Sequence, residues 1–460
     1  MTKNKQPVIA VIDVGKTNKK LFLFDADYNI LFERSARFIE TVDEDGDPCE
    51  NVESLRLSVF DSLRYVFNKK DYCIKAVNFS TYGASFVYLN EDSAPLTPLY
   101  NYLKAYPQTL LEEFYNQYGG EEAFSVRTAS PVLGSLNSGM QLYRLKKEKP
   151  ELFAQIKYAL HLPQYVSYLV SGRFSTDITS VGCHTNLWDF EAAAYHPWIK
   201  IEGLQEKFAP LSPHDATSKA VFPGNNYLVG TGLHDSSAAL IPYLVNFQEP
   251  FILISTGTWC ITLNPFNQNP LTAEELKQDC LCYLQYSGQP VKASRLFAGR
   301  THEEGVKRLA DHFNQDPIKY RSVEFDPELT VVLQQKAKPV DPKNGDIAFA
   351  GRDLASFATY KEAYHQLMLD IVKQQVASTN LVLKGSAVKR LFVDGGFGKN
   401  KLYMNLLAQA YPQLEVYAAS MAQATALGAA LAIHKSWNKK PVPNSLITLQ
   451  YYAAPQEAAI

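Results

Sequence analysis

The sequence lacks the long apolar and long basic segments that mark membrane-spanning and nucleic-acid-binding proteins. No stretch approaches the roughly 20 apolar residues that a transmembrane helix needs. The 45 lysines and arginines are balanced by 47 aspartates and glutamates, so the net charge of -2 gives no indication of nucleic acid or of an anionic membrane. The first apolar run, Val8–Val14, is too short for a signal peptide and is interrupted by Asp13. The sequence therefore predicts a cytoplasmic protein that binds neither a membrane nor nucleic acid.

Cysteine is also scarce, and its spacing gives no sign of a zinc site or a redox pair. The cysteines are scattered along the chain, and none forms a CxxC pair with another. Cys280 and Cys282 are predicted to be alternate residues of one strand. We therefore expect buried or incidental free thiols at all six positions, which are Cys49, Cys73, Cys183, Cys260, Cys280 and Cys282.

The composition that remains is that of an ordinary globular protein. Apolar residues make up 46% and charged residues 20% of the 460-residue chain, which allows two sizeable cores and two to four domains. Three apolar runs predict strands: 8–15, 20–26 and 75–83. One stripe at helical spacing predicts a helix: Leu55, Val59, Leu63 and Val66. Residues 441–460 lack a helical period, which favours a surface tail or an added edge strand. The whole pattern predicts an α/β protein.

One strand–turn–strand pattern occurs twice in the chain. Residues 8–24 form an apolar run, a polar turn with glycine and threonine, and a second apolar run. Residues 250–263 repeat this plan with little sequence identity. The repeat predicts two related halves that face each other, with a boundary near Asn246. We therefore expect one domain at 1–246 and a second at 247–460.

The first polar turn has residues suited to phosphate and magnesium. Gly15 allows a sharp turn, in which backbone N–H groups and hydroxyls can face phosphate oxygens. Asp13 at the strand end could hold Mg²⁺ directly or through water, and Lys20 could neutralise phosphate charge. A plain polar hairpin turn explains the same residues equally well.

Two later turns add features that suit phosphate and a nucleotide. Ser255–Trp259 is a small polar turn after a strand, and beside the first turn it would complete a two-jawed phosphate clamp; an ordinary turn is the alternative. Val393–Asn400 is rich in glycine and lies between a predicted strand and a predicted helix, which allows close approach by a nucleotide. It matches neither GxGxxG nor GxxxxGK[ST], which argues against a Rossmann oxidoreductase and a P-loop.

Asp235 is the candidate catalytic base. It follows the strand-like YLVGTGL and precedes a helix of small residues, which is the exposed position that a base needs; a helix cap is the alternative. The segment Asn78–Phe86 combines small polar residues, an aromatic ring and glycine, which suits a sugar, although a buried strand fits too. The segment Ser180–Asp189 could line the same site or only connect elements. Metal binding by His184 is not expected, because no second histidine lies at ligand spacing.

The order of these motifs resembles that of the FGGY carbohydrate kinases, which belong to the actin, hexokinase and Hsp70-like ATPase superfamily. D-x-G-x-T comes first, H-D-S lies in mid-chain, S-T-G-T-W follows, and G-G-F-G-K-N precedes A-T-A-L-G-A-A at 424–430. The rhamnulokinase branch is the most similar, since STYGASFVYLN at 80–90 resembles its D-T-W-G-V-D-F-V stretch. The resemblance implies an α/β fold of two ribonuclease-H-like (actin-like ATPase) domains with a cleft between them.

The resemblance also implies transfer of the γ-phosphoryl group of MgATP to a sugar hydroxyl, and roles for individual residues. Asp235 would be the general base. The residues implied to contact the sugar are Tyr82, Gly83, Ser85, His234 and Asp235. The residues implied to hold ATP and Mg²⁺ are Asp13, Gly15, Thr17 and Lys20 on the first turn, Gly257 and Thr258 on the second, and Gly395, Gly396 and Asn400 around adenosine. Asp13 would be the metal ligand. Family members are monomers or homodimers, and both remain open.

Several departures from the family leave the sugar open. Ser80 and Ser85 stand where the rhamnulokinase branch tends to have carboxylates, and LYNYLKAYP at 99–107 replaces a stretch that contains arginine. The expected acceptor is a ketose such as L-rhamnulose or L-fuculose, with xylulose, ribulose or glycerol-type substrates as alternatives. Two other classes are an ATPase of the superfamily without a sugar substrate and a sugar-sensing protein without catalysis. The sugar-type loop argues against the first, and the retained carboxylates argue against the second.

Overall fold

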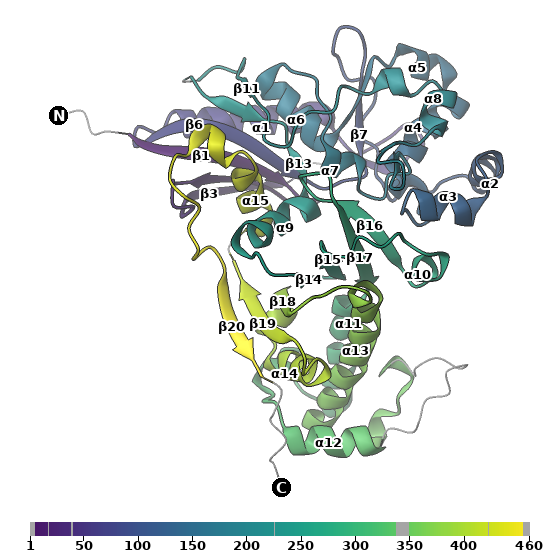
Figure 1. Ribbon diagram of the computed structural model, residues 1–460, viewed down its shortest axis with the longest axis vertical. Helices are drawn as coiled ribbons and strands as arrows, with labels where there is room; N and C mark the ends of the chain where they lie inside the picture. Colours follow the sequence, from purple (N-terminus) through teal and green to yellow (C-terminus); the bar gives the residue numbers. More distant parts are fainter. Residues whose placement is uncertain are drawn as a thin grey trace.

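The computed structural model describes residues 5–16, 18–37, 40–224, 226–336, 349–421 and 423–453. Two mixed β-sheets follow one another along the longest axis of the molecule, and helices lie against both (Figure 1). The first sheet, built from the N-terminal half, lies in the upper part of the view, and the second lies below it. The predicted α/β class is confirmed.

The first sheet has the strand order β11-β12-β6-β1-β2-β3, and β13 pairs with β6 beside this path. Its strands are β1 (Gln6–Val14), β2 (Asn18–Phe24), β3 (Ile30–Arg37), β6 (Tyr72–Thr81), β11 (Thr217–Lys219), β12 (Leu228–Gly230) and β13 (Leu233–His234). β1 and β2 are antiparallel neighbours, so the predicted strand–turn–strand at 8–24 is confirmed. β6 runs parallel to both β1 and β13, with Asp13 opposite Ser80 and His234 opposite Thr81. The carboxyl ends of β1, β6 and β13 therefore meet at one edge of the sheet.

Different helices cover the two faces of the first sheet. The residues Val8–Ile12 of β1 alternate between the two faces, because successive side chains of a strand point to opposite sides. Even-numbered ones pack with α1 (Val52–Phe67) and α6 (Leu162–Ser171), and odd-numbered ones with α9 (Asp235–Asn246) and α15 (Ala424–Ala432). The predicted stripe on α1 is confirmed by the burial of Leu55, Val59, Leu63 and Val66.

The second sheet has the strand order β16-β17-β15-β14-β18-β19-β20. Its strands are β14 (Phe251–Thr256), β15 (Cys260–Asn264), β16 (Cys280–Leu284), β17 (Pro290–Leu296), β18 (Arg390–Gly395), β19 (Glu415–Ser420) and β20 (Thr448–Tyr452). β14 pairs antiparallel with β15 and parallel with β18, which repeats the relation of β1 to β2 and β6. The predicted strand–turn–strand at 250–263 is confirmed, and β20 is the edge strand predicted within 441–460.

Three long helices belong to the second sheet: α11 (Ala298–Phe313), α13 (Tyr360–Leu383) and α14 (Lys401–Ala410). Their buried residues form one core with β14, β15, β18 and β19, in which Leu309, Leu367 and Leu407 are fully buried. Thr359 starts α13 as an N-cap, since its side chain accepts a hydrogen bond from the backbone N–H of Glu362. This core fixes the ends of α11 and α14, which carry the residues of a cavity described below.

Helix α9 lies between the two sheets (Figure 1). Its Ala238 and Ile241 pack in the core of the first sheet, and its Leu240 and Tyr243 pack in the core of the second. The residue that starts this helix, Asp235, is thereby held at the junction of the two halves.

Helix α15 returns from the C-terminal half to the first sheet and packs along α9. An added Cβ at Gly428 of α15 would lie 1.8 Å from the carbonyl oxygen of Ala238, so only glycine allows this close approach. Asn78 of β6 donates a hydrogen bond to the carbonyl oxygen of Ala429 (2.7 Å) and accepts one from the N–H of Gly232 (3.1 Å). The two halves are therefore tied together by tertiary contacts of α15 as well as by the chain near Asn246.

The remaining elements lie around the two sheets (Figure 1). They are β4 (Glu40–Val42), β5 (Pro48–Glu50), β7 (Phe86–Leu89), α2 (Gln108–Gln117), α3 (Glu121–Arg127), α4 (Ser138–Glu148), α5 (Pro150–Gln155), β8 (Tyr158–His161), α7 (Ile178–Val181), β9 (Trp188–Asp189), β10 (Ala194–Tyr195), α8 (Trp198–Ile201), α10 (Ala273–Lys277), α12 (Pro327–Lys336) and α16 (His434–Trp437). All six cysteines are free, and all but Cys73 are buried, as predicted. Among the described residues, no helix has the length and apolar character needed to cross a bilayer.

Candidate active site

Asp235 starts helix α9 at the edge where β1, β6 and β13 end. Its Oδ1 accepts a hydrogen bond from the backbone N–H of Ser236 (2.6 Å), and Nε2 of His234 lies 3.1 Å from the same oxygen. A third of the side chain is exposed (33%), and within the described residues Oδ2 has no hydrogen-bond partner. Burial raises the pKa of Asp235 to about 6, although the hydrogen bonds from Ser236 oppose this. The ionised form therefore predominates at neutral pH, with one carboxylate oxygen left for a ligand.

His234 lies directly between Asp235 and the predicted sugar segment. Burial lowers the pKa of His234 to about 4, so the ring is neutral. Nε2 forms a hydrogen bond with Sγ of Cys183 (3.1 Å) and lies equally close to Oδ1 of Asp235. An added Cβ at Gly83 would lie 2.8 Å from the His234 ring. The structure therefore brings together Gly83, His234 and Asp235, three of the residues implied to contact the sugar.

The other two residues implied to contact the sugar are engaged differently. Tyr82 donates its hydroxyl hydrogen bond to Oε1 of the buried Glu50 (2.8 Å), and Nζ of Lys16 lies 2.9 Å from the same oxygen. Ser85 is 1% exposed, and its hydroxyl has no partner within the described part of the chain. Sequence reasoning did not single out Glu50, since a lone glutamate at the end of a short strand carries no motif.

Asp13 ends β1 at the same edge as Asp235. Oγ1 of Thr425, at the start of α15, donates a hydrogen bond to Oδ2 of Asp13 (2.8 Å). Burial raises the pKa of Asp13 to about 6; the Thr425 hydrogen bond lowers it, and the charge of Asp235 raises it. Lys20 lies opposite Asp13 on β2 and lowers this pKa, while its Nζ is 3.3 Å from Glu33. Asp13 and Asp235 thus form an interacting pair of carboxylates.

The turn after Asp13 determines which groups could bind phosphate and a metal ion. The N–H of Gly15 donates to the carbonyl oxygen of Asn18 (2.9 Å), which closes the turn, and Thr17 lies outside the described residues. Among the residues that the structure describes, no group of three or more His, Cys, Asp or Glu side chains could hold a metal ion. Mg²⁺ is usually held by one or two carboxylates together with phosphate oxygens and water. The single carboxylate of Asp13 therefore fits a magnesium ion that arrives with a phosphate-bearing ligand.

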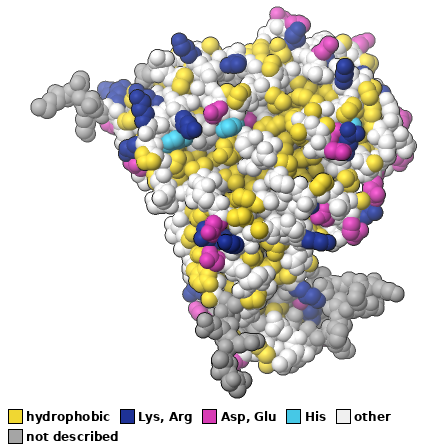
Figure 2. Space-filling view, in the orientation of Figure 1, with side chains coloured by type: hydrophobic (Ala, Val, Ile, Leu, Met, Phe, Trp, Pro, Cys, Tyr) yellow, Lys and Arg dark blue, Asp and Glu magenta, His cyan; other side chains and the backbone are white. Residues whose placement is uncertain are grey.

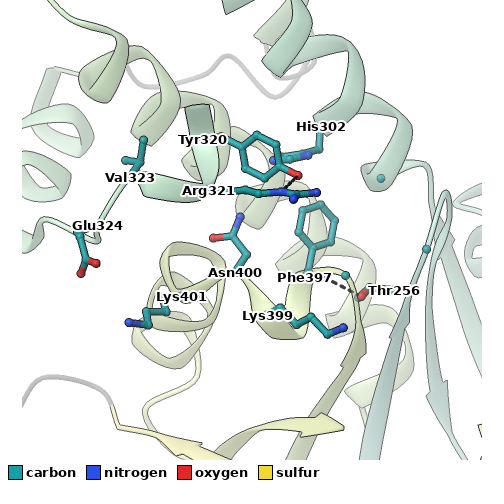
Figure 3. Close-up of a pocket in the computed structure, with 13 residues that line it drawn as sticks. Thr256, His302, Tyr320, Arg321, Val323, Glu324, Phe397, Lys399, Asn400 and Lys401 are labelled. Carbon is teal, nitrogen blue, oxygen red and sulfur yellow. Dashed lines mark hydrogen bonds between the residues drawn. The ribbon is translucent and has the colours of Figure 1, made fainter. Parts of the chain in front are cut away.

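A cavity of about 740 Å³ lies in the second half of the molecule (Figure 3). Its walls come from the β14–β15 turn, helix α11, the 3-10 helix Lys319–Ser322 and the glycine-rich segment before α14. It is lined by Thr256, Gly257, Gly299, His302, Tyr320, Arg321, Val323, Glu324, Gly396, Phe397, Lys399, Asn400 and Lys401. The lining contains three cationic side chains, Arg321, Lys399 and Lys401, and one carboxylate, Glu324, so its charge favours an anionic ligand.

The β14–β15 turn and the glycine-rich segment are in close contact at this cavity. The N–H of Phe397 donates to Oγ1 of Thr256 (3.0 Å). Gly395 has φ +89°, and an added Cβ there would lie 2.0 Å from the carbonyl oxygen of Thr256, so this position requires glycine. Gly396 has φ −63° and nothing within 4 Å of an added Cβ. Gly257, Gly396 and Asn400 line the cavity, whereas Gly395 supports it from behind and the exposed Thr258 is not part of the lining.

Sequence reasoning missed several residues that the structure places at these two sites. His302, Tyr320 and Arg321 line the cavity from α11 and the segment after it. Thr425 belongs to the A-T-A-L-G-A-A motif, but its contact with Asp13 joins residues 412 positions apart. The motif was a usable signal for Thr425, whereas nothing in the local sequence marks His302 or Tyr320 as ligand-binding.

Two protein-family models match successive parts of the chain. Residues 8–222 match the model of the FGGY family of carbohydrate kinases, N-terminal domain, and residues 248–441 match that of carbohydrate kinase FGGY, C-terminal domain. A rhamnulokinase from Halalkalibacterium halodurans is 25% identical over 264 residues, 54% of this chain and 54% of that protein. The match thus spans about half the length of that curated relative.

Solved structures share the fold over nearly the whole chain. A carbohydrate kinase from Novosphingobium aromaticivorans superposes with a TM-score of 0.80 at 23% identity, covering 98% of this chain and 95% of that one. A ligand-bound xylulose kinase from Lactobacillus acidophilus gives a TM-score of 0.79 at 14% identity, covering 97% and 94%. These similarities confirm the predicted fold, which the chain shares with known carbohydrate kinases over nearly its whole length.

Proposed function

The chain belongs to the FGGY family of carbohydrate kinases, and on this basis we propose that it transfers the γ-phosphoryl group of ATP to a hydroxyl group of a small sugar. The observation that supports this most directly is the Asp235 carboxylate: its Oδ1 accepts a hydrogen bond from the N–H of Ser236 and lies beside His234, and its Oδ2 has no partner among the described residues. The cavity lined by Gly257, Gly396 and Asn400 offers a site for the nucleotide.

In this reaction Asp235 accepts the proton of the attacking sugar hydroxyl. A base is most effective when its pKa lies near the working pH, and a pKa of about 6 meets this condition. The N–H of Ser236 orients Oδ1 through a hydrogen bond, and the His234 ring lies beside the same oxygen, which limits the movement of the carboxylate. Such positioning matters because phosphoryl transfer depends chiefly on alignment and on stabilisation of charge.

The phosphate groups would be held by the two polar turns. Backbone N–H groups of such turns can bind phosphate oxygens. The N–H groups of Gly15 and Gly257 close the two turns by donating to Asn18 and Trp259, so other N–H groups of the same turns would be the phosphate donors. Asp13 is the residue that would hold magnesium, which would supply positive charge for the phosphate groups. Thr425 orients the Asp13 carboxylate for that task through its hydrogen bond to Oδ2.

For the acceptor we propose a ketose such as L-rhamnulose or L-fuculose. The partial match to a rhamnulokinase supports this choice. Xylulose, ribulose and glycerol are the alternatives, since Ser80 and Ser85 depart from the rhamnulokinase pattern.

The test is ADP release from MgATP in the presence of a panel of ketoses, aldoses and polyols. Stimulation by one ketose well above the rate without sugar would support the proposal and identify the acceptor. ADP release that no sugar changes would point instead to an ATPase of the superfamily. Thermal stabilisation by a sugar without any ADP release would point to a sugar-binding protein without catalysis.

The proposed reaction should slow in acid through the pair Asp13 and Asp235. Both carboxyl groups have a pKa of about 6, so kcat/KM for the sugar should fall as the pH is lowered through 6. Loss of one ionised group lowers the rate about tenfold per pH unit, and the two groups interact, so the slope should lie between one and two protons. A flat profile between pH 5 and 7.5 would contradict this assignment.

Unfolding would not explain that loss of activity. A carboxyl whose folded pKa is raised adds to stability below its unfolded pKa, and this contribution is lost as the pH rises through the folded pKa. Asp13 and Asp235 therefore favour the folded state at pH 5 more than at pH 7. Unfolding midpoints measured at both pH values are the control for this pair.

Substitution of the neighbouring residues Gly395 and Gly396 by alanine tests the glycine-rich turn at the nucleotide cavity. Gly395→Ala forces a side chain onto φ +89° and into the Thr256 carbonyl, so it should lower the free energy of unfolding by about 2 kcal/mol and weaken ATP binding at least about tenfold. Gly396→Ala should keep the wild-type stability, because its backbone is in the ordinary region and the space is open. Thermal unfolding and ATP titration measure both effects; equal midpoints for the two variants would contradict the argument.

A further inference from the structure

A chain of hydrogen bonds runs from Asn400 into the wall of the nucleotide cavity. Oδ1 of Asn400 accepts hydrogen bonds from the backbone N–H groups of Leu402 and Tyr403, both at 3.1 Å, and thereby caps helix α14. These two donors fix the orientation of the side-chain amide, because only the oxygen can accept them. Nδ2 of Asn400 then donates to the hydroxyl oxygen of Tyr364 (2.8 Å). Nδ2 of Asn400 is therefore the donor in its hydrogen bond with Tyr364.

The direction of the next bond follows from the first. Oη of Tyr364 accepts from Asn400, so its own hydrogen is free to donate, and Nε2 of His302 lies 3.1 Å away. If Nε2 donated instead, the Tyr364 hydrogen would be left in a mostly buried position without a partner among the described residues, which is costly. The hydroxyl hydrogen of Tyr364 has a partner when it donates to Nε2 of His302, so this is the favoured arrangement.

This arrangement decides which nitrogen of His302 carries the proton. Burial lowers the pKa of His302 to about 4, so the ring is neutral and has a single N–H. With Nε2 accepting, that proton is on Nδ1. Within the described part of the chain Nδ1 has no hydrogen-bond partner, and His302 lines the cavity beside Tyr320 (Figure 3).

Aromatic contacts hold the ring in place. The centroid of the His302 ring lies 4.9 Å from that of Tyr320, 5.4 Å from that of Phe397 and 5.9 Å from that of Tyr364. The angles between the ring planes are 85°, 85° and 74°. These edge-on contacts come from three different segments, so they restrict both the position and the tilt of the ring. The result is a rigid N–H donor without a protein acceptor among the described residues, in the wall of a cavity suited to a nucleotide.

We propose that His302 is a specificity-determining residue that donates a hydrogen bond from Nδ1 to an acceptor on the nucleoside of ATP, and that Tyr364 and Asn400 are positioning residues that fix its tautomer. The inference rests on the proposed function, which places ATP in this cavity. The acceptor is a purine ring nitrogen or a ribose hydroxyl oxygen, since both offer a lone pair to an N–H group.

The tautomer is tested without any ligand. In protein labelled with ¹⁵N-histidine, two-bond ¹H–¹⁵N correlation spectra distinguish the two neutral tautomers, and the signals missing in His302→Phe identify this residue. We expect the Nδ1–H form in the wild type and a shift toward the Nε2–H form in Tyr364→Phe. An Nε2–H form in the wild type, or a tautomer that Tyr364→Phe leaves unchanged, would overturn the proposal.

The ligand is tested by ATP titration of the same variants. His302→Phe should weaken ATP binding about tenfold, as expected for one hydrogen bond, and His312→Phe on the exposed side of α11 should leave it unchanged. Deaza-purine and deoxyribose analogues of ATP separate the two acceptor sources, because the analogue that lacks the acceptor should bind wild type and His302→Phe equally. Equal ATP binding by wild type and His302→Phe would overturn the donor role. Absence of ATP binding by the wild type would overturn the proposed function itself, whereas the spectra report on the hydrogen-bond chain alone.

Discussion

Replacing Asp235 by asparagine is expected to lower sugar-dependent ADP release by at least about 10²-fold, as is typical when a general base is removed. The substitution keeps the shape of the side chain, and its amide oxygen can still accept the Ser236 N–H bond. What is lost is the ability to accept the proton of the sugar hydroxyl. The measurement is kcat with saturating MgATP and the sugar identified in the panel.

The control is Asp177→Asn, which makes the same chemical change in a second buried carboxyl group. Asp177 also starts a short helix, α7, and burial also raises its pKa to about 6. Its side chain is 1% exposed, so a substrate cannot reach it. Asp177→Asn should change kcat less than about tenfold; equal activity of Asp235→Asn and the wild type would show that another residue is the base.

Replacing Gly428 by alanine is expected to have the largest effect on stability. The added Cβ would lie 1.8 Å from the carbonyl oxygen of Ala238, and the obstacle is backbone that cannot rotate away. Helices α15 and α9 must separate, which should lower the free energy of unfolding by about 3 kcal/mol or more, at the upper end for an overpacked core. Denaturant unfolding monitored by circular dichroism measures the change.

The same substitution should reduce activity, because α9 carries Asp235 and α15 carries Thr425, the hydrogen-bond donor to Asp13. Gly396→Ala is the matched control for stability, since it makes the same change at a position with nothing within 4 Å. If Gly428→Ala unfolded at the wild-type denaturant concentration, the close packing of α9 against α15 would be wrong.

Local patterns were sufficient to predict the elements that carry the site. The apolar run of β1 and the spacing of Leu55, Val59 and Leu63 are properties of short segments, and the structure confirms the strand and the helix. The position of Asp235 between a strand and a helix of small residues was likewise readable, because turn and capping chemistry is local. The order of the motifs was enough to identify the family.

Other features depend on which distant segments pack together. The Thr425–Asp13 hydrogen bond joins the two ends of the chain, and the Asn400–Tyr364–His302 chain joins three separate helices. Likewise, Glu50 gains its place beside Tyr82 only through tertiary packing.

By itself the sequence determined the α/β class, the repeated strand–turn–strand units, the family and the carboxylate at the start of α9. Each of these depends on periodicity, turn residues or motif order within short stretches of chain. Only the tertiary structure decided that α15 crosses back onto the first sheet, that Asn400 caps a helix while holding Tyr364, and that the proton of His302 is on Nδ1. The physical reason is that burial and hydrogen-bond direction at one residue are fixed by partners that lie from 36 to 412 positions away, and no local pattern records them.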